Sequence, residues 1–451
     1  MLRILLVLAI ICVLLTFIFS IPAVQTSLAS YATSAINEKY KTNIFLDKLQ
    51  LSLITWDTNL RGIYIEDYQQ DTLFYVKTLN TSILNIRNLI NGDLAFGAIK
   101  IDELNFKLKT YKGETNTNLN VFVNKLDDKT PKDPNSPSFH LKSSKVTIIN
   151  SAFKLIDENL ETSEALNFKN LQIQANDFEI LGPVVSTEIK SLAFKSKRGV
   201  SVENLATTFT YTKEQMRFDS LTIKTPKSNL QGDVTMDYGP GDFLDFINKV
   251  QFTADFVDSK VSFDEINLLY DQFGEGREAY FSSNITGVLN DLSTNNLFLV
   301  SDNTGIRGDF NFKNLFTRSA PFIMEADIKN ISTSYYELRG LMPNLLGKTL
   351  PSIFEKFGEF TIRGQATVTE NTINSKVNIN TAIGSSYSDL ELSNIQNIDN
   401  ARYKGFFSLI DFDLGYFVDS KDLGKATLDF NVEGQGFIKE TLNTEIIGDV
   451  Y

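Results

Sequence analysis

Apolar and polar residues alternate with a period of two through much of this chain. Leu171 and Ile173, for example, alternate with Gln172 and Gln174. In an extended strand this spacing sends the apolar side chains to one face and the polar side chains to the other. Strands that are apolar on one face only are typical of antiparallel sheets, so the pattern predicts a mainly β fold.

The same alternation recurs along the body of the chain. Its apolar members include Phe252, Ala254 and Phe256; Phe360, Ile362 and Val368; Val377 and Ile379; and Leu428, Phe430 and Val432. A chain of 451 residues is too long for one ordinary core, so it needs several domains or one elongated, repetitive body. Hydrophobic residues make up 42% of the chain, which is enough apolar surface to offset the entropy lost on folding.

Parts of the sequence are similar to one another, which favours the repetitive body. Gly232-Asp233 aligns with Gly308-Asp309, at an offset of 76 residues. A second alignment matches an Asp near a strand end, a Glu that opens a short apolar helix, and a strand that closes on Gly. Its residues are Asp255, Glu265 and Gly287, then Asp327, Glu337 and Gly364, with a third copy between Asp411 and Gly434. We therefore expect several strands and one helix in each repeat of about 70 to 80 residues.

Two segments, residues 263–273 and 334–357, carry apolar residues at helical spacing, and Pro343 and Pro351 break the second. Such short helices would cap one side of a sheet. The Pro-rich stretch 131–138 predicts a loop between an amino-terminal β module at 46–130 and a repeated body at 139–451.

The segment from Ile4 to Ile21 is apolar apart from Thr16 and Ser20. As a helix it rises about 27 Å, close to the thickness of a bilayer's hydrocarbon core. Residues 1–21 are therefore expected to form a transmembrane signal-anchor helix, and 22–45 a helical connector outside the membrane. Membrane contacts would come from Ile4, Leu8, Ile11, Leu15, Ile18 and Ile21. A signal peptide cleaved near Ile21-Pro22-Ala23 is the alternative.

Residues suited to catalysis or metal binding are scarce. His140 is the only histidine, and the only cysteine, Cys12, lies in the apolar segment, so neither a metal site nor a His-based triad is expected. Asp411 and Asp413 are spaced like a glycosidase pair, but similar pairs occur throughout, and a solvated face explains them better. The formal charge of −12 argues against a nucleic-acid partner. We expect no enzyme activity and no cofactor.

Several glycines recur at matching places, and they are expected to mark turns or bulges of a curling sheet. They are Gly232, Gly308, Gly364 and Gly434.

A sheet of repeated modules can curl into a trough instead of packing against a second sheet. A trough lined by Phe, Leu, Ile and Val would solvate acyl chains, at about 0.8 kcal/mol per buried methylene. The candidate groove residues are Leu171, Ile173, Phe252, Phe256, Phe360, Ile362, Val377, Ile379, Leu428, Phe430 and Val432.

Two runs carry a resemblance to a known family. The opening IPAVQTSLASYATSAINEKYKTNIFLDKLQLSL, with IEDYQQDTLFYVKTLNTSI from Ile65 to Ile83, resembles the start of TamB-like proteins of the AsmA-like superfamily. The run from Tyr403 to Gly436, YKGFFSLIDFDLGYFVDSKDLGKATLDFNVEGQG, looks like a pattern repeated in the bodies of the same family. The Bacteroidetes-type members are the most similar.

The resemblance implies an inner-membrane anchor, a long periplasmic β-groove of the β-taco type, and phospholipid transport towards the outer membrane. It also implies that this chain is the amino-terminal part of a longer protein, whose carboxy-terminal region would engage an Omp85-family barrel. Two alternatives stay open: an assembly factor that templates outer-membrane strands through an open sheet edge, and a structural β-repeat protein of closed sandwiches.

Overall fold

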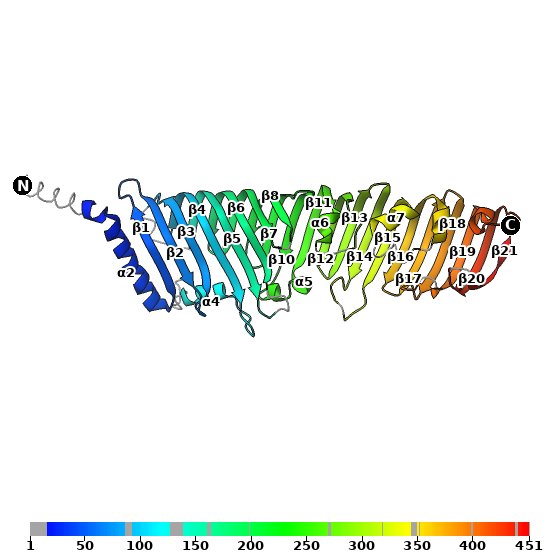
Figure 1. Cartoon of the computed structure of the whole chain (residues 1–451), viewed down its shortest axis with the longest axis horizontal. Coiled ribbons are helices and arrows are strands. Elements are labelled where there is room, and N and C mark those ends of the chain that lie inside the picture. Colours follow the sequence, from blue (N-terminus) through cyan, green and yellow to red (C-terminus); the bar gives the residue numbers. More distant parts are fainter. Residues whose placement is uncertain are drawn as a thin grey trace, which may run out of the picture. The chain divides into compact units, whose positions relative to one another are not determined.

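The computed structural model describes residues 16–85, 93–126, 139–159, 164–197, 199–268, 272–317, 319–343, 350, 352–397, 400–437 and 441–450. They belong to two compact units, Met1–Pro226 and Lys227–Tyr451, and each unit is described by itself. Both units are mainly β, as the alternation predicts (Figure 1).

The first unit consists of helices α2 (Pro22–Tyr40) and α4 (Asn118–Leu126) with nine strands. The strands are β1 (Asn43–Leu51), β2 (Asp57–Glu66), β3 (Thr72–Ser82), β4 (Asp93–Thr110), β5 (His140–Asp157), β6 (Glu164–Leu181), β7 (Val184–Ser196), β8 (Ser201–Tyr211) and β9 (Gln215–Lys224). Each strand pairs with the next one along the chain.

The second unit continues in the same manner, with short helices between some strands. Its strands are β10 (Asn229–Asp237), β11 (Gln251–Ser262), β12 (Glu278–Val288), β13 (Asp291–Ser301), β14 (Thr304–Lys313), β15 (Ile323–Ser334), β16 (Glu359–Thr369), β17 (Thr372–Thr381), β18 (Gly384–Ser393), β19 (Arg402–Asp413), β20 (Lys425–Gln435) and β21 (Asn443–Val450). Its helices are η1 (Asp242–Asp245), α5 (Phe246–Lys249), α6 (Phe263–Asn267), α7 (Tyr335–Leu341), η2 (Ser352–Phe357) and α9 (Leu414–Val418).

The pairing is antiparallel, as expected, with one exception. Strands β4 and β5 run parallel, from Asp93 beside His140 to Thr110 beside Asp157. Parallel neighbours need a connection that returns along the strands, and α4 lies in that connection. The expected boundary at 131–138 lies outside the described residues and does not separate the units, because the strands on either side of it pair directly. The helical connector that was expected at residues 22–45 is shorter in the structure, because strand β1 already begins at Asn43.

Register shows that each sheet has one apolar face, because residues that pair across neighbouring strands point to the same side. In the second unit one row of partners crosses every strand from β10 to β21. The row is Val234, Ala254, Ile285, Thr294, Phe310, Ala326, Ala366, Ser375, Leu390, Gly405, Val432 and Ile446. We call the face that carries this row the inner face of the second unit. The inner face of the first unit is the face that carries the row of partners Leu49, Leu60, Leu79, Ile101, Ile148, Ile173, Leu192, Leu205 and Ile223.

Glycines on the inner face of the second unit sit where neighbouring strands come unusually close. A Cβ added at these positions would lie between 2.0 and 2.5 Å from a carbonyl oxygen of the next strand. The glycines are Gly232, Gly287, Gly308, Gly364 and Gly405. Only a residue without a side chain permits this approach, which lets the sheet bend towards its inner face. The predicted role of glycines in a curling sheet is consistent with this geometry.

Three segments of the second unit share one element of the predicted repeat, a strand followed by a short helix. Strands β11, β15 and β19 each run directly into a short helix, α6, α7 and α9 respectively. Asp255 and Asp327, expected near strand ends, lie inside their strands, because those strands continue to Ser262 and Ser334. Glu265 and Glu337 are in the first helical turns, as predicted.

The short helices α6, α7, η2 and α9 make contacts that join successive parts of the second unit. Phe263 and Leu341, from α6 and α7, pack around the fully buried Ala279. The Arg277 guanidinium lies 2.9 Å from the Glu337 carboxylate. Phe357 of η2 stacks on Phe417 of α9 with ring centroids 5.7 Å apart. The expectation that the short helices cap one side of the sheet is consistent with these contacts.

The predicted break in the second helical segment is observed at the proline that the structure describes. Pro343 comes just after α7, as predicted, whereas Pro351 lies outside the described residues. Only residues 263–267 of the expected helix 263–273 are helical among those described.

Helix α2 lies against the outer edge of β1 and replaces a neighbouring strand there. The Gln25 amide donates to the Leu51 carbonyl at 2.6 Å and accepts from the Leu51 N–H at 2.8 Å. Asn37 makes the same pair of bonds to Ile44, at 2.9 and 2.8 Å. An edge strand with free N–H and C=O groups invites pairing with another chain, and these two amides remove that opportunity.

Replacing Gln25 and Asn37 together by Leu should therefore open this edge. Each substitution leaves a backbone N–H and C=O unpaired, which costs about 1 to 3 kcal/mol of unfolding free energy. Thermal denaturation and light scattering should show a lower melting temperature and concentration-dependent self-association. Ser27→Leu, on the exposed side of the same helix, is the matched control. Equal behaviour of the control and the double variant would contradict the edge-sealing role.

No helix in the described ranges is long and apolar enough to cross a membrane. Of the proposed anchor positions, Ile4, Leu8, Ile11 and Leu15 lie outside those ranges, whereas Ile18 and Ile21 are described and exposed.

Candidate functional site

The inner face of the first unit carries an unbroken aliphatic row. Its members are Leu49, Leu60, Leu79, Ile101, Ile148, Ile173, Leu192, Leu205 and Ile223, one from each strand from β1 to β9. All nine side chains are half-buried rather than enclosed. We call this set the aliphatic row. No polar residue interrupts it, so it offers a continuous apolar path across the sheet.

A second row on the same face is aromatic. Phe74, Phe106 and Phe153 are direct partners on β3, β4 and β5, and their ring centroids lie 6.1 and 5.5 Å apart. Phe168 continues the row at 6.0 Å and stacks on Phe194 at 4.0 Å. Rings at these separations contact one another, so the row forms a continuous aromatic surface.

The second unit combines buried and half-buried apolar residues on its inner face. Ile362 pairs with Ile379, and Phe430 pairs with Phe407 at a centroid separation of 5.5 Å. Every predicted groove residue is on the inner face of its unit: Leu171 and Ile173 in the first, and Phe252, Phe256, Phe360, Ile362, Val377, Ile379, Leu428, Phe430 and Val432 in the second. Leu171, Phe360, Val377 and Val432 are buried, and the others are half-buried.

Sequence analysis missed other members of this face. Phe310 and Ile328 belong to a buried cluster with Ala326. The alternation that would have revealed β15 shifts by one residue at a bulge between Ile328 and Ile331. A strict period of two misplaces Ile331, which follows the bulge, whereas Phe310 and Ile328 keep the alternation of their strands and could have been found from it.

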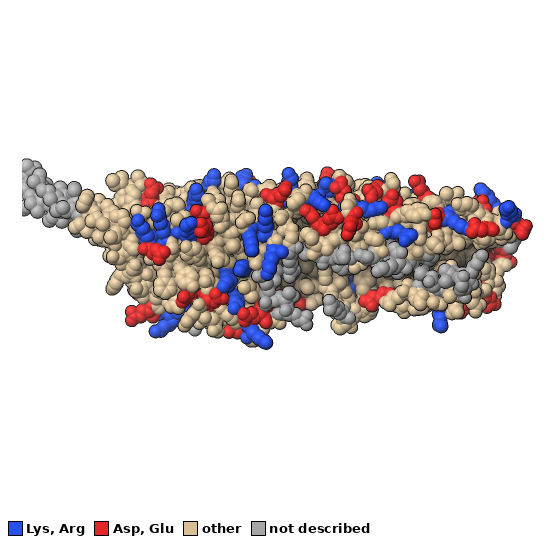
Figure 2. Space-filling model, viewed as in Figure 1, with Lys and Arg blue, Asp and Glu red and all other residues tan. Residues whose placement is uncertain are grey.

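The opposite face is charged and polar. Cross-strand ion pairs there include Lys376 with Asp389 at 2.9 Å and Lys404 with Glu433 at 2.9 Å. Both signs of charge are interspersed over the surface in view (Figure 2). Because these side chains are exposed, each pair contributes little stability, and their main effect is to keep this face in water.

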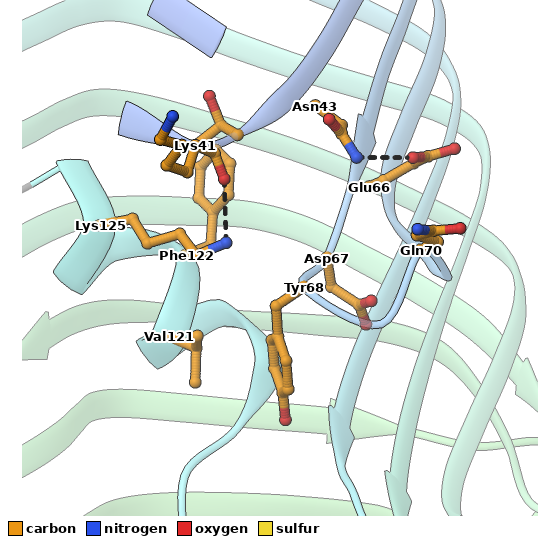
Figure 3. Close-up of a pocket in the computed structure, with 10 residues that line it drawn as sticks. Lys41, Asn43, Glu66, Asp67, Tyr68, Gln70, Val121, Phe122 and Lys125 are labelled. Atoms are coloured by element: carbon orange, nitrogen blue, oxygen red, sulfur yellow. Dashed lines mark hydrogen bonds between the residues drawn. The ribbon is translucent and has the colours of Figure 1, made fainter. Parts of the chain in front are cut away.

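A small cavity of about 140 Å³ lies between the C-terminal end of α2, the turn after β2, and α4 (Figure 3). Its walls include Tyr68, Phe122 and Lys125, and the Lys125 ammonium donates to the Lys41 carbonyl at 2.9 Å. The cavity is too small for an acyl chain. We interpret it as a packing gap beneath α4.

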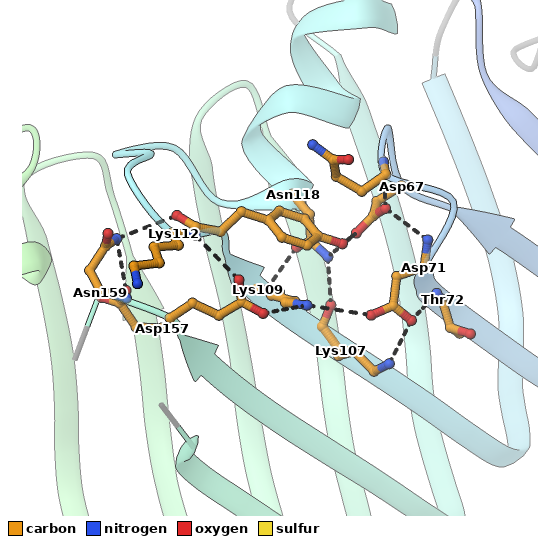
Figure 4. Close-up of polar contacts among 12 residues, drawn as sticks. Asp67, Asp71, Thr72, Lys107, Lys109, Lys112, Asn118, Asp157 and Asn159 are labelled. Atoms are coloured by element: carbon orange, nitrogen blue, oxygen red, sulfur yellow. Dashed lines mark hydrogen bonds and ion pairs between the residues drawn. The ribbon is translucent and has the colours of Figure 1, made fainter. Parts of the chain in front are cut away.

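Next to this cavity, a polar network fixes α4 to the sheet (Figure 4). The buried Asp67 carboxylate accepts from the Tyr111 hydroxyl at 2.8 Å and the Asn118 amide at 3.0 Å. Lys107 lies 2.7 Å from Asp71, and Lys109 lies 2.8 Å from Glu158. Because these groups bond to one another, we interpret the role of the network as structural.

Two carboxyl groups of this network have pKa values below their ordinary range. Burial acts to raise the pKa of Asp71, but the Lys107 hydrogen bond, the Thr72 N–H and the charges of Lys107 and Lys109 outweigh it. The Lys109 hydrogen bond is the main cause of the lowered pKa of Glu158. Both groups therefore bind protons more readily in the unfolded chain than in the folded one.

Acid should accordingly weaken the first unit. A depressed carboxyl pKa contributes stability that is complete above the unfolded value of about 4 and is lost as pH falls through the folded value. Melting temperatures measured from pH 6 down to pH 3 should fall, and hydrogen exchange at α4 should accelerate. Lys107→Met should flatten the part of this dependence that Asp71 contributes. A pH profile unchanged by Lys107→Met would be evidence against this assignment.

The residues considered for catalysis have structural partners. His140 is half-buried; its Nε2 lies 2.8 Å from Glu179 and its Nδ1 lies 3.0 Å from Asp93. Asp413 caps α9 by accepting from the Tyr416 N–H, and Asp411 occupies a bulge with φ of 49°. Among the described residues, no group of three or more His, Cys, Asp or Glu is arranged to hold a metal ion.

Comparison with known proteins adds no relative. No protein-family model matches the chain, and no curated protein matches it.

Proposed function

We propose that this chain is a non-enzymatic lipid-transfer protein that is anchored in the inner membrane and carries phospholipid acyl chains along its inner face through the periplasm. The aliphatic row is the observation that supports this proposal most directly. It gives acyl methylenes an apolar surface across nine consecutive strands, while the charged opposite face stays in water.

The resemblance to TamB-like proteins extends the proposal to the rest of the pathway. On this reading residues 1–21 anchor the chain, phospholipid moves towards the outer membrane, and an Omp85-family barrel is a partner. Neither a cofactor nor a nucleic acid takes part.

The two alternatives are less well supported. An assembly factor that works by strand addition needs a free sheet edge; Gln25 and Asn37 occupy the edge of β1, which leaves β21, paired only with β20 among the described strands, as the one edge for it. A repeat of closed sandwiches needs a second sheet over each apolar face, whereas the described strands of each unit pair in chain order into one sheet.

Photo-crosslinking from both faces tests the proposal. A benzophenone amino acid at Ile379, half-buried on the inner face, should yield phospholipid adducts in cells, detected by mass spectrometry. The same amino acid at Asn378, exposed on the opposite face, should yield none. Equal labelling at both positions, or no lipid at Ile379 in functional protein, would exclude the conduit.

A further inference from the structure

We propose that the tip of the β1–β2 hairpin, Ser52–Trp56, and the residues just before α2, Phe17–Ile21, form one surface that contacts the phospholipid bilayer. This inference rests on the proposed function, since it assumes an anchored chain. It adds a second point of membrane contact, which would fix the orientation of the first unit relative to the bilayer.

Both parts of this surface expose large apolar side chains. Ile54 is 87% exposed, the highest value for any large hydrophobic residue described, and Phe17 is 70% exposed. Phe19 and Ile21 are exposed as well. One exposed Ile is ordinary, but several exposed large side chains at one place indicate an interaction surface.

Gln25 joins the two parts. Its amide donates to the Phe19 carbonyl at 2.8 Å as well as to Leu51, the last residue of β1. Gln25 is only 5% exposed, so this junction is protected from solvent. The hairpin tip and the residues before α2 therefore lie side by side.

The turn that presents Ile54 is held by its own hydrogen bonds. The Trp56 N–H donates to the Ser52 carbonyl at 2.8 Å, and the Thr55 hydroxyl donates to Asp57 at 2.7 Å. An exposed apolar residue on an ordered turn loses little conformational entropy when it is buried, which favours binding.

The chemistry of the surrounding chain points to lipid as the partner. The sequence carries no Lys, Arg, Asp or Glu between Arg3 and Glu38, and Thr16 is the only polar residue between Ile4 and Phe17. In Figure 2 the surface over α2 is free of charged side chains except towards the helix's C-terminal end. Trp56, next to the tip, is the residue type that favours the membrane interface.

The test uses the full chain in vesicles of phosphatidylethanolamine and phosphatidylglycerol. In a Cys12→Ser background, Ile54→Cys carries an environment-sensitive fluorophore, and Gln70→Cys, on the turn at the opposite end of β2, is the matched control. We expect blue-shifted emission at position 54, with at least twofold quenching by lipids spin-labelled near the headgroup, and no change at position 70. Both positions are exposed, and circular dichroism confirms that the variants fold.

Three outcomes would overturn the proposal: no quenching at position 54, equal quenching at both positions, or burial of the label in detergent that grows with protein concentration. The last would assign the tip to a second copy of this chain. Lipid crosslinking at Ile379 is measured separately. Quenching at 54 without lipid at Ile379 would retain the membrane contact and reject the conduit, whereas the reverse would reject only the membrane contact.

Discussion

Ile173→Asp should abolish lipid transfer while leaving the protein folded. Ile173 is in the aliphatic row between Ile148 and Leu192, so a carboxylate there interrupts the apolar path in the middle of the sheet. Acyl chains would have to pass an ionised group, or the group would have to take up a proton at a raised pKa. Transfer of fluorescent phospholipid between vesicles should fall at least tenfold.

The fold should tolerate this substitution because Ile173 is only half-buried and water can solvate the new carboxylate. We expect a loss of about 1 to 3 kcal/mol in unfolding free energy. Gln172→Asp, exposed on the opposite face of the same strand, should change neither transfer nor stability. Normal transfer by a folded Ile173→Asp protein would show that the aliphatic row does not carry lipid.

Gly364→Val should cause the largest loss of stability in the second unit. A Cβ at this position would lie 2.1 Å from the Lys376 carbonyl oxygen, and the backbone φ of +140° is one that Val rarely adopts. Backbone strain and the forced separation of β16 from β17 together should cost about 3 to 5 kcal/mol. Urea denaturation monitored by circular dichroism measures this loss.

Gly305→Val is the matched control for Gly364→Val. Gly305 is also in a strand, yet an added Cβ meets no atom within 4 Å and its φ is not positive. A β-branched residue suits such a position, so stability should stay the same or rise slightly. If both variants lost the same stability, close strand approach would not be the reason for glycine at 364.

Which side chains share a face could be predicted from the order of residues alone. Alternation with a period of two placed Ile362, Ile379 and Phe430 together, and pairing register agrees, because a strand leaves only two directions for a side chain. It also indicated the junctions at which β11, β15 and β19 pass into short helices, since alternation stops where each helix begins. The apolar run before Phe17 can also be recognised from the sequence, but its residues up to Leu15 lie outside the described ranges.

Which residues meet across neighbouring strands could not be predicted from the order of residues and is known only from the fold. The aliphatic row depends on the register of eight strand pairs, including the parallel pair β4–β5, and local patterning does not specify any of them. A bulge also shifts the register before Ile331, so a strict period of two would assign this residue to the wrong face. The edge seal by Gln25 and Asn37 had no sequence signal, because an amide takes the place of a strand only when a helix is packed beside that strand.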